Sequence, residues 1–168
     1  LFKQRTFENC TGLKTISLPN EKIDTSAIAI FGHTSLDENG IDLSCLTTLG
    51  FGIFKNCKFV HIFIPNTLLL DMDYSQQWQD NLRLLTMELE EGLSVVPNSL
   101  CSGCSSLMTI TFPSTITTIG SSVVHGCNNL KSFICKPITP PALVSDLGYI
   151  YADFNIYVPD ESVETYKI

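Results

Sequence analysis

One thirteen-residue pattern, Phe-x-x-Cys-x-x-Leu-x-x-Ile-x-Leu-Pro, recurs along the chain and constrains the fold more than any other feature. The first copy runs from Phe7 to Pro19, and copies with the same spacing surround Cys104 and Cys127. Another copy surrounds Cys57, with one residue deleted after the cysteine. A repeat of 20 to 50 residues is typical of solenoids and related arrays, so the repeat has to be read before any single motif.

The intervals between these cysteines reveal two further, degenerate copies. Cys10 to Cys57 and Cys57 to Cys104 are both 47 residues, about twice the 23 residues from Cys104 to Cys127. Each long interval therefore holds one hidden copy. The first contains Phe31, Thr34, Leu36, Ile41 and Leu43, and the second contains Trp78, Asn81, Leu84, Met87 and Leu89. We call the cysteine position of each copy the anchor; the six anchors are Cys10, Thr34, Cys57, Asn81, Cys104 and Cys127.

A repeat of this length cannot bury its own apolar face, so successive turns must stack around one shared core. The Leu-x-x-Ile-x-Leu part predicts a short strand in a parallel sheet, with Ile and the last Leu inward and the residue between them outward. Proline ends the strand because it has no N–H for the ladder. A weaker half-repeat, Pro-x-x-Ile-x-x-Ile-Gly at Pro113–Gly120, predicts an opposite wall. We expect Gly50 and Gly120 to form bends at positive φ.

Residues 49–57, LGFGIFKNC, and 119–127, IGSSVVHGC, resemble the BspA-type leucine-rich repeats, whose recurring text is close to IGxxAFxxCxxLxxIxIP. The resemblance spans about residues 5–136, and the tail resembles the closing segment of such proteins from gut Bacteroidetes. It implies a leucine-rich-repeat solenoid: a right-handed superhelix of short parallel strands with little helix, with about six repeats of 23–24 residues and a C-terminal cap. It also implies a secreted or surface-attached bacterial protein, often described as an adhesin, without catalysis.

Composition narrows the class of partner. The chain has 168 residues, the length of one domain with a substantial core. Its formal net charge of -7 disfavours nucleic acid and anionic lipid head groups as partners. No apolar run approaches the roughly 20 residues of a membrane span. Residues 1–5 do not begin a signal peptide. Because the chain enters mid-repeat, we expect further sequence upstream, including a signal for export to the cell surface or the extracellular space.

Seven cysteines invite readings as disulfides, metal ligands or redox centres. Four occupy the anchor position, where we expect a small, buried, structural thiol without a disulfide. A bond between Cys104 and Cys127 is an alternative that the spacing of adjacent turns permits. Cys101 and Cys104 form a C-x-x-C, but Cys101 stands at the repeat's Phe position, and we expect it to be structural. Asp71-Met72-Asp73 is interpreted as a solvated acidic loop rather than a metal site.

We predict no enzyme activity, cofactor or metal. The three histidines fall in different turns, and no nucleophile, base and orienting group lie at catalytic spacing. Any function then belongs to the outward positions of the strands. The central column of these positions is Ser17, Asp42, Phe63, Glu88, Thr111 and Ile134.

The middle of this face is unusually apolar for a solvated sheet. The residues that we predict to form a partner-binding surface are Val60, His61, Phe63, Leu85, Glu88, Met108 and Thr111. Exposed apolar side chains gathered on one face are typical of a protein interface, and they also allow self-association. The alternative is that the insert carrying Tyr74 and Trp78 folds over them.

The repeat stops after residue 136, where three prolines argue against another regular turn. We expect one domain, with repeats over residues 1–136 and a capping segment over 137–168. The cap should contain one or two strands within residues 149–158 and a short helix N-capped by Asp160 and running through Tyr166.

Two functions are compatible with these features. The first is a non-catalytic surface module that binds a protein or a glycan through the outward face. The second is a structural spacer that holds another part of an envelope protein away from the cell and has no specific ligand.

Overall fold

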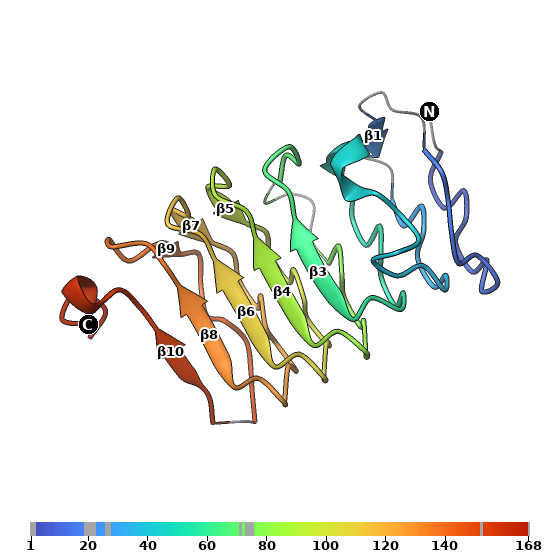
Figure 1. The fold of residues 1–168 in the computed structure, drawn as a ribbon. Helices are drawn as coiled ribbons and strands as arrows, with labels where there is room; N and C mark the ends of the chain where they lie inside the picture. Colours follow the sequence, from blue (N-terminus) through green and yellow to red (C-terminus); the bar gives the residue numbers. More distant parts are fainter. Residues whose placement is uncertain are drawn as a thin grey trace.

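The computed structural model describes residues 3–18, 23–25, 28–70, 72, 76–151 and 153–167. The turns follow one another along a single axis, with the N-terminus at one end and the C-terminus at the other (Figure 1). Parallel strands make up nearly all of the regular structure, and the helices among the described residues are two three-residue 3-10 segments. The predicted leucine-rich-repeat solenoid is confirmed. Asp71, Asp73 and Tyr74, which entered the loop predictions above, lie outside the described residues.

Five parallel strands form the front sheet, in the order β3, β4, β6, β8 and β10. Their bounds are His61–Ile64, Thr86–Leu89, Thr109–Phe112, Ser132–Cys135 and Asn155–Tyr157. In the first four of these strands the second and fourth residues are buried and the first and third are partly or fully exposed. The inward Ile-x-Leu pair of each repeat is therefore placed as its period of two requires.

A second wall runs along the opposite side of the core. It begins with the pair β1 (Ile23–Thr25) and β2 (Leu46–Leu49) and ends with β5 (Val95–Val96), β7 (Thr118–Ile119) and β9 (Ala142–Leu143). A parallel bridge between Thr48 and Leu69 continues it between the two groups. These positions recur about every 23 residues, as expected for the weaker half-repeat.

An aromatic stack joins the first four turns inside the core. The rings of Phe7, Phe31, Phe54 and Trp78 follow one another with centroids 5.7, 5.6 and 5.7 Å apart. Trp78 is fully buried at the aromatic position of its repeat. It therefore does not fold over the front sheet, and that part of the alternative prediction is wrong. The degenerate copy anchored at Asn81 is confirmed, because Asn81, Leu84, Met87 and Leu89 are all buried.

The second copy keeps its anchor in the core but forms no front strand. Residues 37–40, Asp-Glu-Asn-Gly, form a turn in which the N–H of Asn39 donates to Asp37 Oδ1 at 3.0 Å and that of Gly40 donates to the Asp37 carbonyl at 3.0 Å. The 3-10 helix η1 (Leu43–Cys45) follows, and its N-cap Asp42 accepts from the Ser44 N–H. The first copy likewise forms no strand within residues 3–18. Ser17 and Asp42 therefore do not belong to the central strand column, and that part of the prediction is wrong.

Gly120 has a role other than the predicted one. Neither Gly50 nor Gly120 is among the described residues with positive φ. A Cβ at Gly120 would lie 2.6 Å from the backbone nitrogen of Asn98 in the preceding turn. Glycine is therefore needed there for close approach of two backbones rather than for a left-handed bend.

The tail extends both walls before it closes the end of the solenoid. β10 lies within the predicted range, whereas β9, directly after Pro141, was not expected. Proline is tolerated there because β9 is the edge strand of its sheet. The expected helix is a single 3-10 turn, η2 (Asp160–Ser162), with N-cap Pro159 and no side-chain cap, so the predicted capping by Asp160 is wrong. Tyr166 instead donates from its hydroxyl to the Pro137 carbonyl at 2.9 Å.

Candidate ligand-binding surface

The strand registers align the outward side chains of the front sheet in columns. Phe63, Glu88, Thr111 and Ile134 are successive partners, and Tyr157 of β10 extends the column. A neighbouring column starts at His61, whose Nδ1 lies 2.8 Å from Thr86 Oγ1. Side chains in one column are spaced by the distance between neighbouring strands, about 4.8 Å. The outward positions therefore form one continuous surface.

Val60, Leu85 and Met108 form a third column, just before β3, β4 and β6. The N–H of Leu85 donates to the Val60 carbonyl at 2.8 Å, and that of Met108 donates to the Leu85 carbonyl at 2.9 Å. All seven residues predicted for a partner-binding surface thus lie on the front face. Phe63 is 51% exposed and Met108 46% exposed. Glu88 is exposed as well, and its Oε1 lies 3.8 Å from Lys136 Nζ.

The front sheet is hollowed where the second copy lacks its strand. A groove with a volume of about 1260 Å³ lies between β3 and the turns before it. The partly exposed apolar residues Ile16, Leu18 and Leu43 line it together with His61 and Phe63. The charged groups among the described lining residues are four carboxylates, and neither lysine nor arginine lines the groove. They belong to Glu38, Asp42, Glu88 and Glu90.

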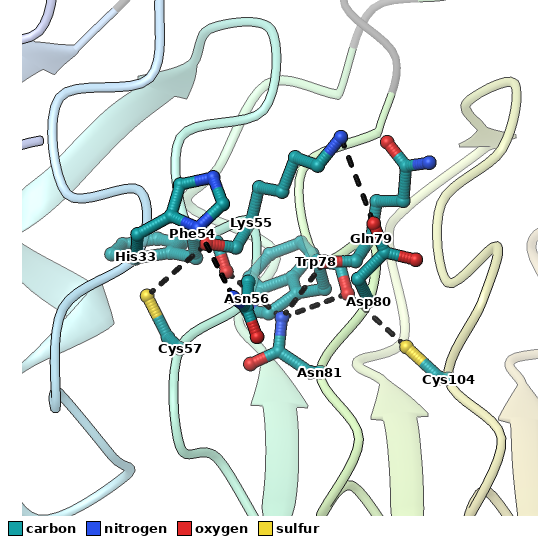
Figure 2. Close-up of polar contacts among 10 residues, drawn as sticks. All are labelled: His33, Phe54, Lys55, Asn56, Cys57, Trp78, Gln79, Asp80, Asn81 and Cys104. Atoms are coloured by element: carbon teal, nitrogen blue, oxygen red, sulfur yellow. Dashed lines mark hydrogen bonds and ion pairs between the residues drawn. The ribbon is translucent and has the colours of Figure 1, made fainter. Parts of the chain in front are cut away.

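The side chain at the anchor position donates a hydrogen bond to a backbone carbonyl, a role that the sequence pattern did not reveal. Cys57 Sγ donates to the Phe31 carbonyl at 3.1 Å, and Cys104 Sγ donates to the Trp78 carbonyl at 3.1 Å. Asn81 Nδ2 donates to the Phe54 and Trp78 carbonyls, both at 2.8 Å (Figure 2). Each acceptor on the preceding turn is the carbonyl of that turn's aromatic position. The anchor therefore ties neighbouring turns together through a donor.

The seven cysteines, all among the described residues, are free thiols. Burial raises the pKa of Cys57 and of Cys104 above the ordinary value, and a hydrogen bond with Cys127, together with burial, raises that of Cys101. Cys10 is exposed, contrary to the prediction of a buried thiol. The reason is that no described turn precedes it to cover its side chain or accept its hydrogen bond. Within the described ranges, no three His, Cys, Asp or Glu side chains are arranged as metal ligands.

Carboxylates supply a second kind of tie between turns. Glu38 Oε2 accepts from the Val60 N–H at 3.0 Å, and Glu90 Oε2 accepts from the Asn66 N–H at 2.8 Å. Glu91 accepts from the N–H of Ser114 at 3.0 Å and from its hydroxyl at 2.8 Å. The hydrogen bond from the Ser114 N–H, the largest contribution, holds the pKa of Glu91 below its ordinary value. These three glutamates thus accept hydrogen bonds from backbone N–H groups of a neighbouring turn, as a backbone carbonyl would.

Comparison with known proteins agrees with this geometry. The family model for the BspA type leucine rich repeat region matches six copies over residues 2–75 and 30–139. No curated protein sequence matches. A crystal structure of a leucine-rich repeat protein from Bacteroides ovatus is similar in fold, with a TM-score of 0.50 and 17% identity over 94% of this chain. This chain spans 58% of that protein's length. None of the helices in the described parts of the chain is long and apolar enough to span a membrane.

Proposed function

Because this chain belongs to the BspA type leucine-rich repeat family, we propose that it is a non-catalytic binding module that recognises a protein through its front face. Leucine-rich repeat proteins are in general interaction or scaffold modules. The observation that carries the proposal is the exposure of two apolar side chains on the front face, Phe63 on β3 and Met108 just before β6. Apolar side chains gathered on one exposed face are typical of a protein interface.

The proposed surface consists of Val60, His61, Phe63, Leu85, Glu88, Met108 and Thr111. Val60, Leu85 and Met108 form an apolar column where the strands begin, and Phe63 lies further along β3, beside Glu88 of β4. Protein interfaces combine exposed apolar side chains with polar neighbours, and a few of these side chains usually carry most of the binding energy. We further propose that the module acts at the cell surface or outside the cell. A signal peptide and a lipidation cysteine at the start of the precursor would support that location.

A binding experiment with matched variants tests the front face. The immobilised chain is offered extracellular matrix and mucosal proteins, and each captured protein is purified and titrated against the wild type, Phe63→Ala, Glu88→Ala and Leu143→Ala. Leu143 is a comparably exposed apolar residue on the second wall. We expect Phe63→Ala to weaken binding roughly tenfold, or about 1.4 kcal/mol, and Leu143→Ala to leave it unchanged. Binding that survives both front-face substitutions would contradict the proposal, and absence of any ligand would favour the spacer.

A further inference from the structure

The edge of β3 that faces the groove carries backbone groups with no strand partner among the described residues. The Val60 carbonyl accepts from Leu85 N–H at 2.8 Å, and the Ile64 carbonyl accepts from Glu90 N–H at 3.0 Å, so these carbonyls point toward β4. Alternate residues of a paired strand direct their N–H and C=O groups to opposite sides. His61 and Phe63 therefore direct theirs into the groove. Within the described residues, the front sheet has no strand beyond β3.

The turn at residues 37–40 and the helix η1 stand where the missing strand would pair. They leave the edge open and cover only its beginning, where Glu38 Oε2 accepts from the Val60 N–H. A carbonyl of the preceding turn makes the equivalent bond in the next repeat, where Val60 accepts from Leu85. Four backbone groups, the N–H and C=O of His61 and Phe63, are then available to another extended chain. Such an edge is a template for strand addition.

The walls of the groove indicate what kind of chain fits. Ile16, Leu18, Leu43 and Phe63 line it with partly or fully exposed apolar side chains, while its charged groups are the four carboxylates named above. Its volume of about 1260 Å³ exceeds the roughly 300–1,000 Å³ of small-molecule pockets and suits a peptide segment. Successive side chains of an extended peptide point to opposite sides, so one side can meet the apolar residues and the other the acidic ones.

We propose that the groove binds an extended segment of a partner protein that alternates apolar residues with lysine or arginine and adds to β3 as a further strand. The proposal rests on the proposed function, because it specifies the partner for the N-terminal end of the same face. Charge favours such a segment over a second copy of this chain, whose net charge is -7.

Synthetic peptides test the strand geometry directly. The probe is a fluorescein-labelled heptapeptide of alternating lysine and valine, and its control has glutamate in place of lysine. We expect saturable binding of the lysine peptide by fluorescence anisotropy, weaker at high salt, and at least roughly tenfold weaker binding of the glutamate peptide. Two further peptides carry N-methyl groups on all valines or on all lysines. Because alternate N–H groups face opposite edges, one methylated peptide should lose binding and the other should keep it.

Variants of the chain test the edge and the charge separately. Phe63→Pro removes an N–H that faces the groove, while Phe63→Ala keeps the N–H and controls for loss of the ring. We therefore expect the proline variant to bind the lysine peptide at least roughly tenfold more weakly than the alanine variant. The double variant Glu38→Gln and Glu90→Gln keeps the acceptors for Val60 and Asn66 but removes two charges, and it should bind the lysine peptide more weakly. If circular dichroism shows that the proline variant is unfolded, the pair of N-methylated peptides decides the geometry.

Several results would overturn the groove proposal: no saturable binding of the lysine peptide, equal binding of both methylated peptides, or full binding by a folded Phe63→Pro variant. If the chain sediments as a dimer and Phe63→Pro dissociates it, the groove proposal is also overturned, in favour of a second copy as the occupant.

Met108→Glu separates this proposal from the proposed function, because Met108 lies on the front face outside the groove lining. If Met108→Glu loses binding of a front-face ligand but still binds the lysine peptide, the front face and the groove are two distinct parts of the surface. A chain that binds that ligand but no peptide contradicts the groove proposal alone.

Discussion

Cys57, Asn81, Cys104 and Cys127 differ in size and polarity, yet each donates to a backbone carbonyl of the preceding turn. In Cys57, Cys104 and Cys127 the donor is a thiol, which also packs as a small apolar group. In Asn81 the donor is an amide, and its Oδ1 is buried without a hydrogen-bond partner among the described residues. The shared requirement of this position is a donor of limited size, which explains why asparagine is accepted in the core.

Asn81→Ala and Asn81→Cys should therefore differ in stability. Alanine leaves the Phe54 and Trp78 carbonyls without the bonds from Asn81, at a cost of about 1–3 kcal/mol in the free energy of unfolding. Cysteine restores one donor and removes the unpaired Oδ1, so we expect it to cost at least about 1 kcal/mol less than alanine. Urea unfolding followed by the fluorescence of Trp78, the only tryptophan, measures both variants. Equal destabilisation would show that the donor does not matter.

The buried thiols should make stability depend on alkaline pH. Burial raises the pKa of Cys57, Cys104 and Cys135 above 9.0 in the folded state. The unfolded thiols ionise first, so the stability that neutral thiols contribute is complete below pH 9.0 and is lost as the pH rises toward the folded values. The slope is at most about 1.4 kcal/mol per pH unit for each thiol.

Cys104→Ser should flatten this alkaline slope, since a serine hydroxyl donates but does not ionise in this range. Cys10→Ser, at the exposed anchor, is the matched control and should leave the slope unchanged. Denaturation midpoints across the alkaline range provide the measurement. A wild-type slope of zero above pH 9.0 would contradict the sign derived from the raised pKa values.

At the scale of elements, β3 and β6 have the same length and the same alternation, but only β6 is paired on both sides. Proline at matching positions of the two strands tests this difference. The N–H of Thr111 faces β4, so Thr111→Pro removes a ladder hydrogen bond and should cost about 1–3 kcal/mol. The N–H of Phe63 faces the groove, so Phe63→Pro should cost clearly less, and chemical denaturation compares the two. Equal costs would show that β3 is paired on its outer edge.

The turn at residues 37–40 shows how a short segment shapes a surface. Asp, Glu, Asn and Gly are poor strand formers, and Asp and Asn readily close turns. Gly40 is also fixed by its neighbours, because a Cβ there would collide with the Lys14 carbonyl. The turn in the second copy therefore opens a groove beside the sheet that the four later copies build without interruption.

Across the whole molecule, the turns differ in how well neighbours cover them. Central turns are packed on both sides, whereas Phe7, Leu13, Ile16 and Leu18 of the first turn are only partly buried. Stability in a solenoid is close to a sum of repeat and neighbour terms, so opening should begin where coverage is least. We expect amides of residues 3–18 to exchange with deuterium much faster than those of β4, β6 and β8. Uniform protection measured by mass spectrometry would indicate that all described turns open as one unit.

Much of this architecture could be predicted from the sequence. The repeat period fixed the number of copies, and the Ile-x-Leu alternation identified the inward pairs from β3 to β8, because apolar side chains at a period of two must share one buried face. The aligned column from Phe63 to Ile134 followed from the same spacing. These features depend on local pattern and on the need of each turn to bury its apolar face against the next.

The tertiary structure decided what depends on contacts between turns. The donor role of Asn81 and the close approach at Gly120 are set by residues about 23 positions away, which a local pattern does not contain. Cys10 is exposed because no described turn packs before it. The groove also depends on how the turns stack on one another. The Asp-Glu-Asn-Gly turn was visible in the sequence, but only stacking shows that it leaves β3 with an open edge, because a strand edge is defined by the neighbour that does or does not pair with it.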